Sequence, residues 1–594
     1  MSTLDEMLDQ AFWAYNQKDY DSAEDLARQV LTIAPAQGDG LYLLGLIASK
    51  MGAYEPAEKL LYQAVQLYPD NKQYKLSLGF ILEKQGRLDE ALSFYEAYKE
   101  DAFVLAEIGF IYLQKGQPDF AKSAFDKSLF LNSAVLTAYI GKALILRRQG
   151  ALQESLDLLQ EGLNQGQSAE LYYQLAMAYR LTGKLKPAKQ AIENALKMEE
   201  VASFYNEKGL IEEAEGLMQS AKISYETALS KNAYLADAYF NLGNIYLKEK
   251  NFKKAEDSYK RALGVDKDFL NAHHNLALVL HEENRLTEAL EHLRSVIILA
   301  PNHTSSLYNL AIILEETGDY SEAAGLYFNL LSQNKEIPDL NFRIQNTLTF
   351  LAKGDKKDKK QALSFAKGWV KNFPESVVAV YTHASLTGEK VTPELSKKYA
   401  EVLYDAFALS YDAKMQKLEA GVLKKMEEFL HQKTFENVLD LGCGTGNLVS
   451  YLEKANSLTG VDISKNMLLI AGEKEAYTRL VHQDILSFLE ADDDCYDLIV
   501  ASDVTGYFSN MELFLKRVYE HLTKEGTFLF TIELGDSQLD EALLENARFV
   551  YKEPFVTHLL LKTGFSIQTK EEIQLRKEGD GMAQGILYAT SKAS

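Results

Sequence analysis

The sequence predicts an all-α solenoid over residues 1–386 and an α/β domain with a mostly parallel sheet over residues 399–594, joined by a linker at 387–398. Two observations carry this prediction. Small residues recur in pairs with a period of about 34 residues through the first two-thirds of the chain. In the last third, short apolar runs alternate with helical patterns, which is typical of a parallel sheet.

In each pair of small residues, the second follows the first by twelve positions. The pairs are Ala11/Ala23, Gly45/Ala57, Gly79/Ala91, Gly109/Ala121, Ala143/Ser155, Ala176/Ala188, Gly209/Ala221, Gly243/Ala255, Ala277/Ala289 and Ala311/Ala323. Small residues let two antiparallel helices approach closely. The predicted turns between the helices carry Gly52, Gly86, Gly116, Gly150, Gly183, Gly216, Asn284 and Gly318. Glycine and asparagine tolerate the left-handed backbone that ends many helices.

This pattern resembles the tetratricopeptide repeat, a helix–turn–helix unit of about 34 residues. Ten repeats are clear, and a degenerate unit lies near residues 343–376, followed by a capping helix at about 376–385. The charged run A-K-G-D-K-K-D-K-K in the degenerate unit is predicted to be a solvated loop, with a docking patch as the alternative. Because a single repeat cannot bury its apolar face, the units are expected to stack into a solenoid with a concave, partner-binding face.

Three successive repeats place asparagine two residues before the first small position: Asn241, Asn275 and Asn309. An asparagine amide offers a donor and an acceptor, so it can hold the backbone of an extended peptide. The series resembles the asparagine ladder of O-linked N-acetylglucosamine transferase, which implies a protein or peptide in the groove. The alternative is a set of solvated or locally bonded asparagines.

The α/β domain is organised around V-L-D-L-G-C-G-T-G. Val438–Leu441 is predicted to be a buried strand, and Gly442, Gly444 and Gly446 follow it at alternate positions. Leu448, Val449 and Leu452 predict a helix after the turn. Glycines at this place let the backbone pass close to a ligand. The dinucleotide fingerprint would need glycine at position 447, where the chain has asparagine.

The turn resembles motif I of the class I S-adenosylmethionine (SAM) methyltransferases. The resemblance implies a Rossmann-like domain with a mostly parallel seven-stranded sheet and SAM as the cofactor. It places Gly442, Gly444 and Gly446 under the methionine and ribose of the cofactor, and Asp440 near its amino group. The segment from Tyr404 to Met415 resembles the one that precedes such domains, which implies that Tyr411 closes over the cofactor.

Further site residues are expected at the carboxyl ends of later strands. Asp462 ends the second predicted strand, twenty residues after Gly442, where an acid accepts hydrogen bonds from ribose hydroxyls. The resemblance implies that Asp484 and Ile485 contact the adenine, and Met467 is expected either there or in the core. Ser502, Asp503 and Tyr507 follow the fourth predicted strand and should lie near the transferred methyl group. Asp503 is the candidate base if the acceptor must lose a proton.

The composition limits which kinds of partner and which cellular compartment are expected. A net charge of −22 argues against broad nucleic-acid binding, and the sequence has no apolar run long enough to span a bilayer. The start of the sequence lacks a signal-peptide pattern, and neither of the two cysteines has metal-ligand spacing. A cytoplasmic protein without a metal site is expected.

Three functions remain open from the sequence. The first is a SAM-dependent methyltransferase whose solenoid recruits a protein or peptide. The second is a small-molecule or cell-envelope methyltransferase whose repeats serve assembly. The third is a non-enzymatic scaffold with a vestigial SAM domain, against which the intact glycine turn and Asp462 argue. The acceptor atom is undefined, because neither the N-P-P-Y motif nor the two-glutamate loop of other methyltransferases is present.

Overall fold

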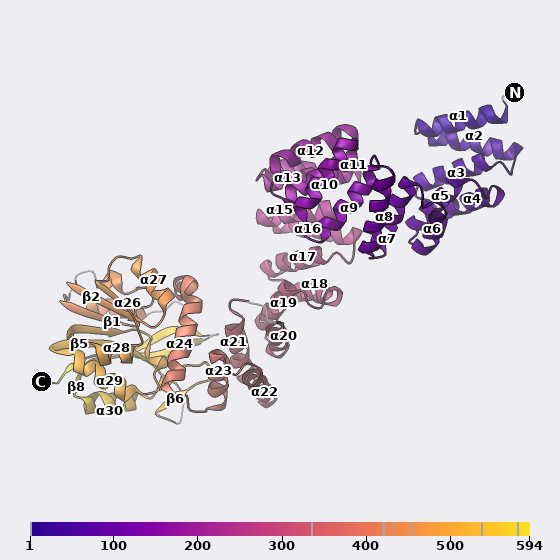
Figure 1. The fold of residues 1–594 in the computed structure, drawn as a ribbon. Coiled ribbons are helices and arrows are strands. Elements are labelled where there is room, and N and C mark those ends of the chain that lie inside the picture. Colours follow the sequence, from indigo (N-terminus) through magenta and orange to yellow (C-terminus); the bar gives the residue numbers. More distant parts are fainter. Residues whose placement is uncertain are drawn as a thin grey trace. The chain divides into compact units, whose positions relative to one another are not determined.

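The computed structural model describes residues 3–333, 337–417, 422–431, 433–452, 455–535, 539–578 and 581–593. The chain divides into two compact units, Met1–Val279 and Leu280–Ser594. Figure 1 labels many of their helices and strands.

The first unit is all-helical and consists of antiparallel helix pairs, as the repeat pattern predicts (Figure 1). Its helices are α1 (Leu4–Asn16), α2 (Tyr20–Ile33), α3 (Gly38–Lys50), α4 (Tyr54–Leu67), α5 (Lys72–Lys84), α6 (Leu88–Tyr95), α7 (Ala102–Gln114), α8 (Pro118–Leu131), α9 (Leu136–Arg148), α10 (Leu152–Gln165), α11 (Ala169–Leu181), α12 (Leu185–Met198), α13 (Ala202–Ala214), α14 (Met218–Lys231), α15 (Ala236–Lys248) and α16 (Phe252–Val265). A 3₁₀ turn, η1 (Glu96–Tyr98), extends α6. Helix α17 (Leu270–Glu282) contains the boundary between the units.

The turns inside the repeats use the left-handed backbone that their residue types predict. All the predicted turn glycines have positive φ, between 69° at Gly116 and 84° at Gly318, and Asn284 has φ 59°. Two repeats use lysine at this place instead: Lys18 with φ 67° and Lys250 with φ 56°. The sequence pattern alone did not reveal these two turns, because lysine is not a residue that favours this conformation.

Glycine is required in several repeats because an aromatic ring of the second helix lies against the first helix. A Cβ atom added to Gly109 would lie 2.5 Å from the ring of Phe125, and one added to Gly243 would lie 2.5 Å from the ring of Tyr259. Both rings are fully buried. Close packing of this kind leaves no room for a methyl group. In these repeats the small residue is therefore a packing requirement of the helix pair.

The second unit begins with the last helix pairs. These are α18 (Leu286–Leu299), α19 (Thr304–Thr317), α20 (Tyr320–Ser332), α21 (Leu340–Ala352), α22 (Lys356–Asn372) and α23 (Val377–Thr387). The prediction of a loop over the charged run is wrong for most of its length. Asp355 caps α22 by accepting hydrogen bonds from the amides of Lys357 and Asp358, so the lysines form the first turns of the helix.

The rest of the second unit is an α/β domain. Its helical elements are α24 (Pro393–Phe407), η2 (Ala408–Ser410), α25 (Tyr411–Lys417), α26 (Val422–Leu430), η3 (Val449–Tyr451), α27 (Lys465–Gly472), α28 (Ile485–Ala491), η4 (Thr505–Tyr507), α29 (Met511–His521) and α30 (Glu553–Thr563). Its strands are β1 (Asn437–Leu441), β2 (Ser457–Asp462), β3 (Arg479–His482), β4 (Tyr496–Ala501), β5 (Leu522–Glu533), β6 (Glu541–Leu543), β7 (Phe549–Tyr551), β8 (Phe565–Glu578) and β9 (Gly581–Lys592).

Seven of these strands form one sheet in the order β3-β2-β1-β4-β5-β9-β8. Strands β1 to β5 are parallel to one another, and β9 pairs antiparallel with both β5 and β8. The expectation of a mostly parallel, seven-stranded, Rossmann-like sheet is confirmed. After the glycine turn the structure has the short 3₁₀ turn η3 in place of the predicted helix, and the small hairpin β6–β7 was not predicted.

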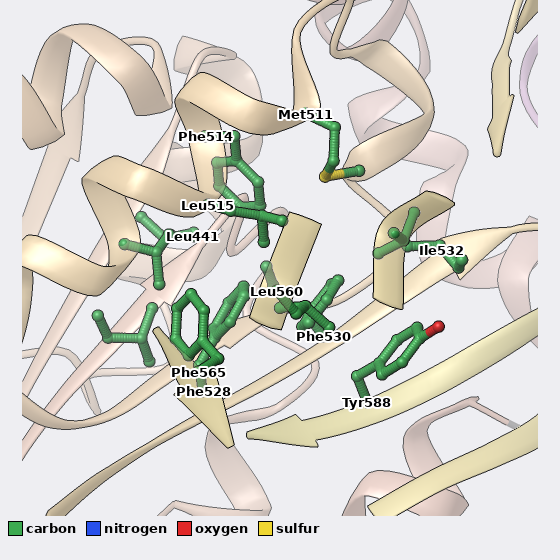
Figure 2. Close-up of a cluster of buried hydrophobic side chains, with 14 of the residues drawn as sticks. Leu441, Met511, Phe514, Leu515, Phe528, Phe530, Ile532, Leu560, Phe565 and Tyr588 are labelled. Carbon is green, nitrogen blue, oxygen red and sulfur yellow. The ribbon is translucent and has the colours of Figure 1, made fainter. Parts of the chain in front are cut away.

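Alternate residues of β1 enter cores on opposite faces of the sheet. Leu439 and Leu441 join a core that includes residues of α29 and α30, whereas Val438 joins a second core with α26. Figure 2 shows the first core, where aromatic side chains of β5 pack beside Leu441. The rings of Phe528 and Phe530 stack with their centroids 4.4 Å apart. Burial on both faces explains why the parallel strands are almost continuously apolar.

Helix α24 packs between the last helix pairs and the α/β domain of the second unit. The ring of Tyr399 on α24 stacks on Tyr381 of α23 with a centroid distance of 4.0 Å, and its hydroxyl donates to Gln345 of α21 at 2.8 Å. Farther along α21, the Thr349 hydroxyl donates to the carbonyl oxygen of Glu545 at 2.9 Å. These contacts are buried or half-buried. The end of the repeat array therefore packs against the sheet domain directly and through α24.

Candidate active site

The glycine turn after β1 has the backbone that the three glycines predict. Gly442, Gly444 and Gly446 have φ values of 72°, 55° and 78°. A Cβ on Gly442 would lie 2.2 Å from the Val504 side chain, whereas a Cβ on Gly444 would meet no atom within 4 Å. Gly444 thus faces open space at the carboxyl edge of the sheet, where parallel α/β sheets bind their ligands.

Two cavities meet at this turn, with Tyr411, Gly442, Gly444, Ser502 and Asp503 lining both. One has a volume of about 260 Å³, and its wall also includes Asp462, Asp484, Ile485 and Tyr507 together with residues of α24. The other has a volume of about 410 Å³ and also includes Asp440, Asp412 and Met415. Of the predicted site residues of this domain, all except Gly446 and Met467 line one or both cavities. Met467 is fully buried in the core.

Asp462 organises the turn and still faces the cavity. Its Oδ2 accepts a hydrogen bond from the Gly444 amide and its Oδ1 accepts one from the Ser464 amide, both at 2.8 Å. Burial raises the pKa of Asp462 above its usual range. Each carboxylate oxygen has a second lone pair, so the side chain can also accept hydrogen bonds from a diol.

Asp440 carries a buried oxygen that has no hydrogen-bond partner among the described residues. Its Oδ2 accepts from the Tyr477 hydroxyl at 2.7 Å, and Oδ1 is the unpartnered atom. Burial raises the pKa of Asp440 to about 7. An unsatisfied buried carboxylate is costly, and a bound cation removes that cost. Because Asp440 lines the larger cavity, the residues present fit a ligand with an ammonium group there.

Asp484 is held by its own helix and by α24. Its Oδ1 accepts from the Ser487 amide at 3.1 Å as the cap of α28, and Oδ2 lies 2.9 Å from the Lys397 Nζ. Burial alone would raise the pKa of Asp484, but these hydrogen bonds and the lysine bring it below its usual range. Ile485 lines the cavity beside it, as an adenine contact requires.

The segment that covers the site is fixed by two aspartates that the sequence analysis did not single out. Asp412 on α25 accepts from the Thr445 hydroxyl at 2.6 Å and from the Asn447 amide group at 3.0 Å. Asp405 on α24 accepts from the Ser464 hydroxyl at 2.6 Å. These bonds connect the covering segment to the turns after β1 and β2. No local motif reveals them, because each joins residues far apart in the sequence.

Asp503 belongs to a buried ionic network at the end of β4. It has φ 54°, and its Oδ1 accepts from Arg548 at 2.5 Å and from Arg576 at 3.4 Å. Both arginines also bind Glu533, at 2.7 and 2.8 Å. Arg548 donates as well to the Tyr507 hydroxyl at 3.0 Å. The guanidinium groups of Arg548 and Arg576 thus hold the Asp503 carboxylate in place.

In the repeats, two of the predicted groove asparagines are partly engaged within the first unit. The Asn241 amide group donates to Asn206 at 3.0 Å, and that of Asn275 donates to Asn244 at 2.8 Å. Asn241 is buried and Asn275 is half-buried. Asn309 lies half-buried on α19 of the second unit. In the first two, the amide oxygen is the atom left for a partner.

Comparison with known proteins assigns both regions. Residues 411–570 match a methyltransferase domain family, and residues 42–103, 109–170, 169–201, 236–269 and 274–335 match tetratricopeptide repeat families. The chain combines tetratricopeptide repeats with a C-terminal methyltransferase domain. Repeats of this kind generally bind protein partners. No described helix has the length and apolar character needed to cross a membrane.

The relatives place the domain among methyltransferases. A malonyl-[acyl-carrier protein] O-methyltransferase of Bacillus cytotoxicus is 27% identical over 23% of this chain and 50% of its own length. A putative methyltransferase of Geobacillus sp. is 33% identical over 22% of this chain and 57% of its own. The chain thus spans about half the length of these curated relatives. A demethylmenaquinone methyltransferase of Symbiobacterium thermophilum is 27% identical over 32% of this chain and 80% of its own.

A solved SAM-dependent methyltransferase of Clostridium acetobutylicum is 24% identical, with all of that chain and 32% of this one covered and a TM-score of 0.26. This likeness concerns the fold alone.

Proposed function

We propose that the protein is a SAM-dependent methyltransferase and that its repeats recruit the protein or peptide that is modified. The observation that carries the cofactor assignment is the cradle formed by Gly444, Asp462 and Asp440. Gly444 leaves room for the ligand, Asp462 accepts from the ribose hydroxyls, and the buried Oδ1 of Asp440 receives the ammonium group. Asp484 and Ile485 recognise the adenine, and Tyr411 covers the site.

In this proposal the cofactor supplies the methyl group and the leaving group, and the protein orients the reactants and excludes water. Asp412 and Asp405 keep the covering segment closed over the turn. Positioning of this kind contributes up to about 7–11 kcal/mol to lowering the barrier. The limits of 1–386, 387–398 and 399–594 for the repeat region, the linker and the catalytic domain stay predictions.

The affinity for SAM should rise with pH near neutrality. The ammonium group needs the ionised form of Asp440, and the pKa of this carboxyl is raised to about 7 by burial. We expect the affinity to be roughly eightfold lower at pH 6.0 than at pH 7.5, measured by isothermal titration calorimetry. Asp440→Asn should bind weakly at both pH values, whereas Asp493→Asn, an exposed control, should behave as the wild type.

Stability gives a second readout for the same carboxyl. A raised folded-state pKa means that its contribution to stability is present at low pH and is lost as the pH rises through about 7. In the absence of ligand, Asp440→Asn should therefore unfold at a higher temperature than the wild type at pH 8. Equal affinities of the wild type at the two pH values, or no binding by the folded wild type, would contradict the proposed cofactor site.

The recruitment proposal predicts a separate loss. Replacing Asn241, Asn275 and Asn309 together by alanine should lower kcat/KM for a protein substrate about tenfold or more, because each amide contributes roughly 0.5–1.5 kcal/mol to peptide binding. The substrate is first identified by labelling the proteins of a cell extract with radioactive SAM. SAM affinity should not change, and Asn164→Ala, an exposed position on α10, serves as the control. Unchanged turnover would favour repeats that serve assembly.

A further inference from the structure

The walls of the two cavities carry many more negative than positive side chains. Among the described residues that line them, the carboxylates are Glu394, Asp412, Asp440, Asp462, Asp484 and Asp503, and the cation is Lys397. Lys397 is paired with Asp484 at 2.9 Å. A low-dielectric wall focuses such a field on whatever enters the cavity. The site therefore favours positively charged ligands.

The guanidinium groups near the site do not reverse this balance. Arg548 and Arg576 lie behind the wall and line neither cavity. Both bind Glu533, and both also bind Oδ1 of Asp503. Arg548 is buried to 8% exposure, and its donors are directed to protein acceptors. A carboxylate or phosphate entering the cavity would meet Asp503 and Glu394 without a cation set aside for it.

Asp503 lines both cavities, and three tyrosine rings line one of them with it. Its Oδ1 takes the two guanidinium groups, and Oδ2 makes no hydrogen bond among the described residues. The ring of Tyr404 lies edge to face with those of Tyr411 and Tyr507, at centroid distances of 6.2 and 5.5 Å. All three tyrosines line the cavity that Asp503 shares. Aromatic rings beside a carboxylate are a typical binding site for organic cations, and the Tyr507 ring already has the Arg548 guanidinium 4.9 Å from its centroid.

We infer that the methyl acceptor is a basic nitrogen that enters as a cation between Asp503 and the rings of Tyr404, Tyr411 and Tyr507. This inference rests on the proposed function and names its substrate class. The acceptor ammonium releases one proton to water; its lone pair then forms the nitrogen–carbon bond, and the carbon–sulfur electron pair stays on sulfur. The positive charge passes from sulfur to nitrogen. Asp503 orients the nitrogen as a hydrogen-bond acceptor, in place of the general base expected from the sequence.

The test compares two probes of equal shape and different charge. The full-length protein is saturated with S-adenosylhomocysteine and titrated in a calorimeter with choline or with 3,3-dimethylbutan-1-ol, its uncharged isostere. Choline should bind about tenfold more tightly than the alcohol. Asp503→Asn should remove that preference, because asparagine keeps the shape and tolerates the positive φ but lacks the charge. Tyr404→Leu should weaken choline binding roughly threefold.

Two controls distinguish the effect of losing the Asp503 charge from the effect of losing the fold. Asp493→Asn removes an exposed carboxylate outside both cavities and should keep the preference for choline. Circular-dichroism melting checks that each variant is folded. The inference would be overturned by equal affinity for the two probes or by no binding of either. It would also be overturned if acetate, titrated in the same way, bound more tightly than choline. In each case the proposed function stays intact if S-adenosylhomocysteine binds. Failure of S-adenosylhomocysteine to bind the folded wild type would overturn both.

Discussion

Replacing Gly444 by alanine is expected to lower the affinity for SAM at least a hundredfold while the protein stays folded. Gly444 lines both cavities, and its Cβ would project into the open space of the site. The φ of 55° adds a backbone cost of about 1–2 kcal/mol to the free energy of folding. Calorimetry would measure the affinity, and urea unfolding would measure the stability.

Gly388 provides the matched control for this substitution. It ends α23 in the same unit with φ 72°, and an added Cβ would also meet no atom within 4 Å. Gly388→Ala should therefore have a similar backbone cost and unchanged SAM affinity, because Gly388 lines neither cavity. Equal losses of affinity in the two variants would mean that strain, and not occupation of the site, causes the effect.

Removing the charge of Glu533 should be the most destabilising of the proposed substitutions. Glu533 is 4% exposed and binds both Arg548 and Arg576. Glu533→Gln leaves two buried guanidinium groups with Asp503 as the remaining carboxylate between them, at a cost of about 3–5 kcal/mol. Urea unfolding at pH 7 would measure the loss.

The pH dependence of stability and a surface variant test whether the lost buried ion pairs cause the destabilisation. Burial alone would raise the pKa of Glu533, but Arg548 and Arg576 hold it below its usual range. Its contribution to stability is thus present at neutral pH and is lost as the pH falls below the usual carboxylate range, where the variant and the wild type should converge. Glu512→Gln breaks the exposed ion pair with Lys562 and should change stability little. A loss for Glu533→Gln no larger than this would contradict the prediction.

The parts of the fold that depend on local chemistry could be predicted from the sequence. Turn glycines and buried small residues act within one repeat, so the period was visible in the residue types. The same holds for the glycine turn after β1. The carboxyl edge that gathers Asp462, Asp484 and Asp503 followed from the rule for parallel strands.

The remainder depends on contacts between distant residues or on capping. Glu533 lies in β5, Arg576 in β8 and Arg548 just before β7, and nothing in their local sequence indicates that they form one network with Asp503. The charged run resembles a loop, but α22 starts within it because Asp355 caps the helix. The capping side chain accepts hydrogen bonds from amides that would otherwise be exposed to solvent. From the sequence, Met467 could contact the adenine or lie in the core. The packing of α27 places it in the core.

The stack of Tyr399 on Tyr381 has a practical consequence for protein engineering. A fragment designed to begin at residue 399 would lose the first half of α24, and with it Lys397 and Ser396 from the cavity wall. It would also leave the ring of Tyr399 without the helices that cover it. An expressed fragment of the catalytic portion should therefore begin before α21. It would then keep the terminal helices of the array together with the sheet that they help to enclose.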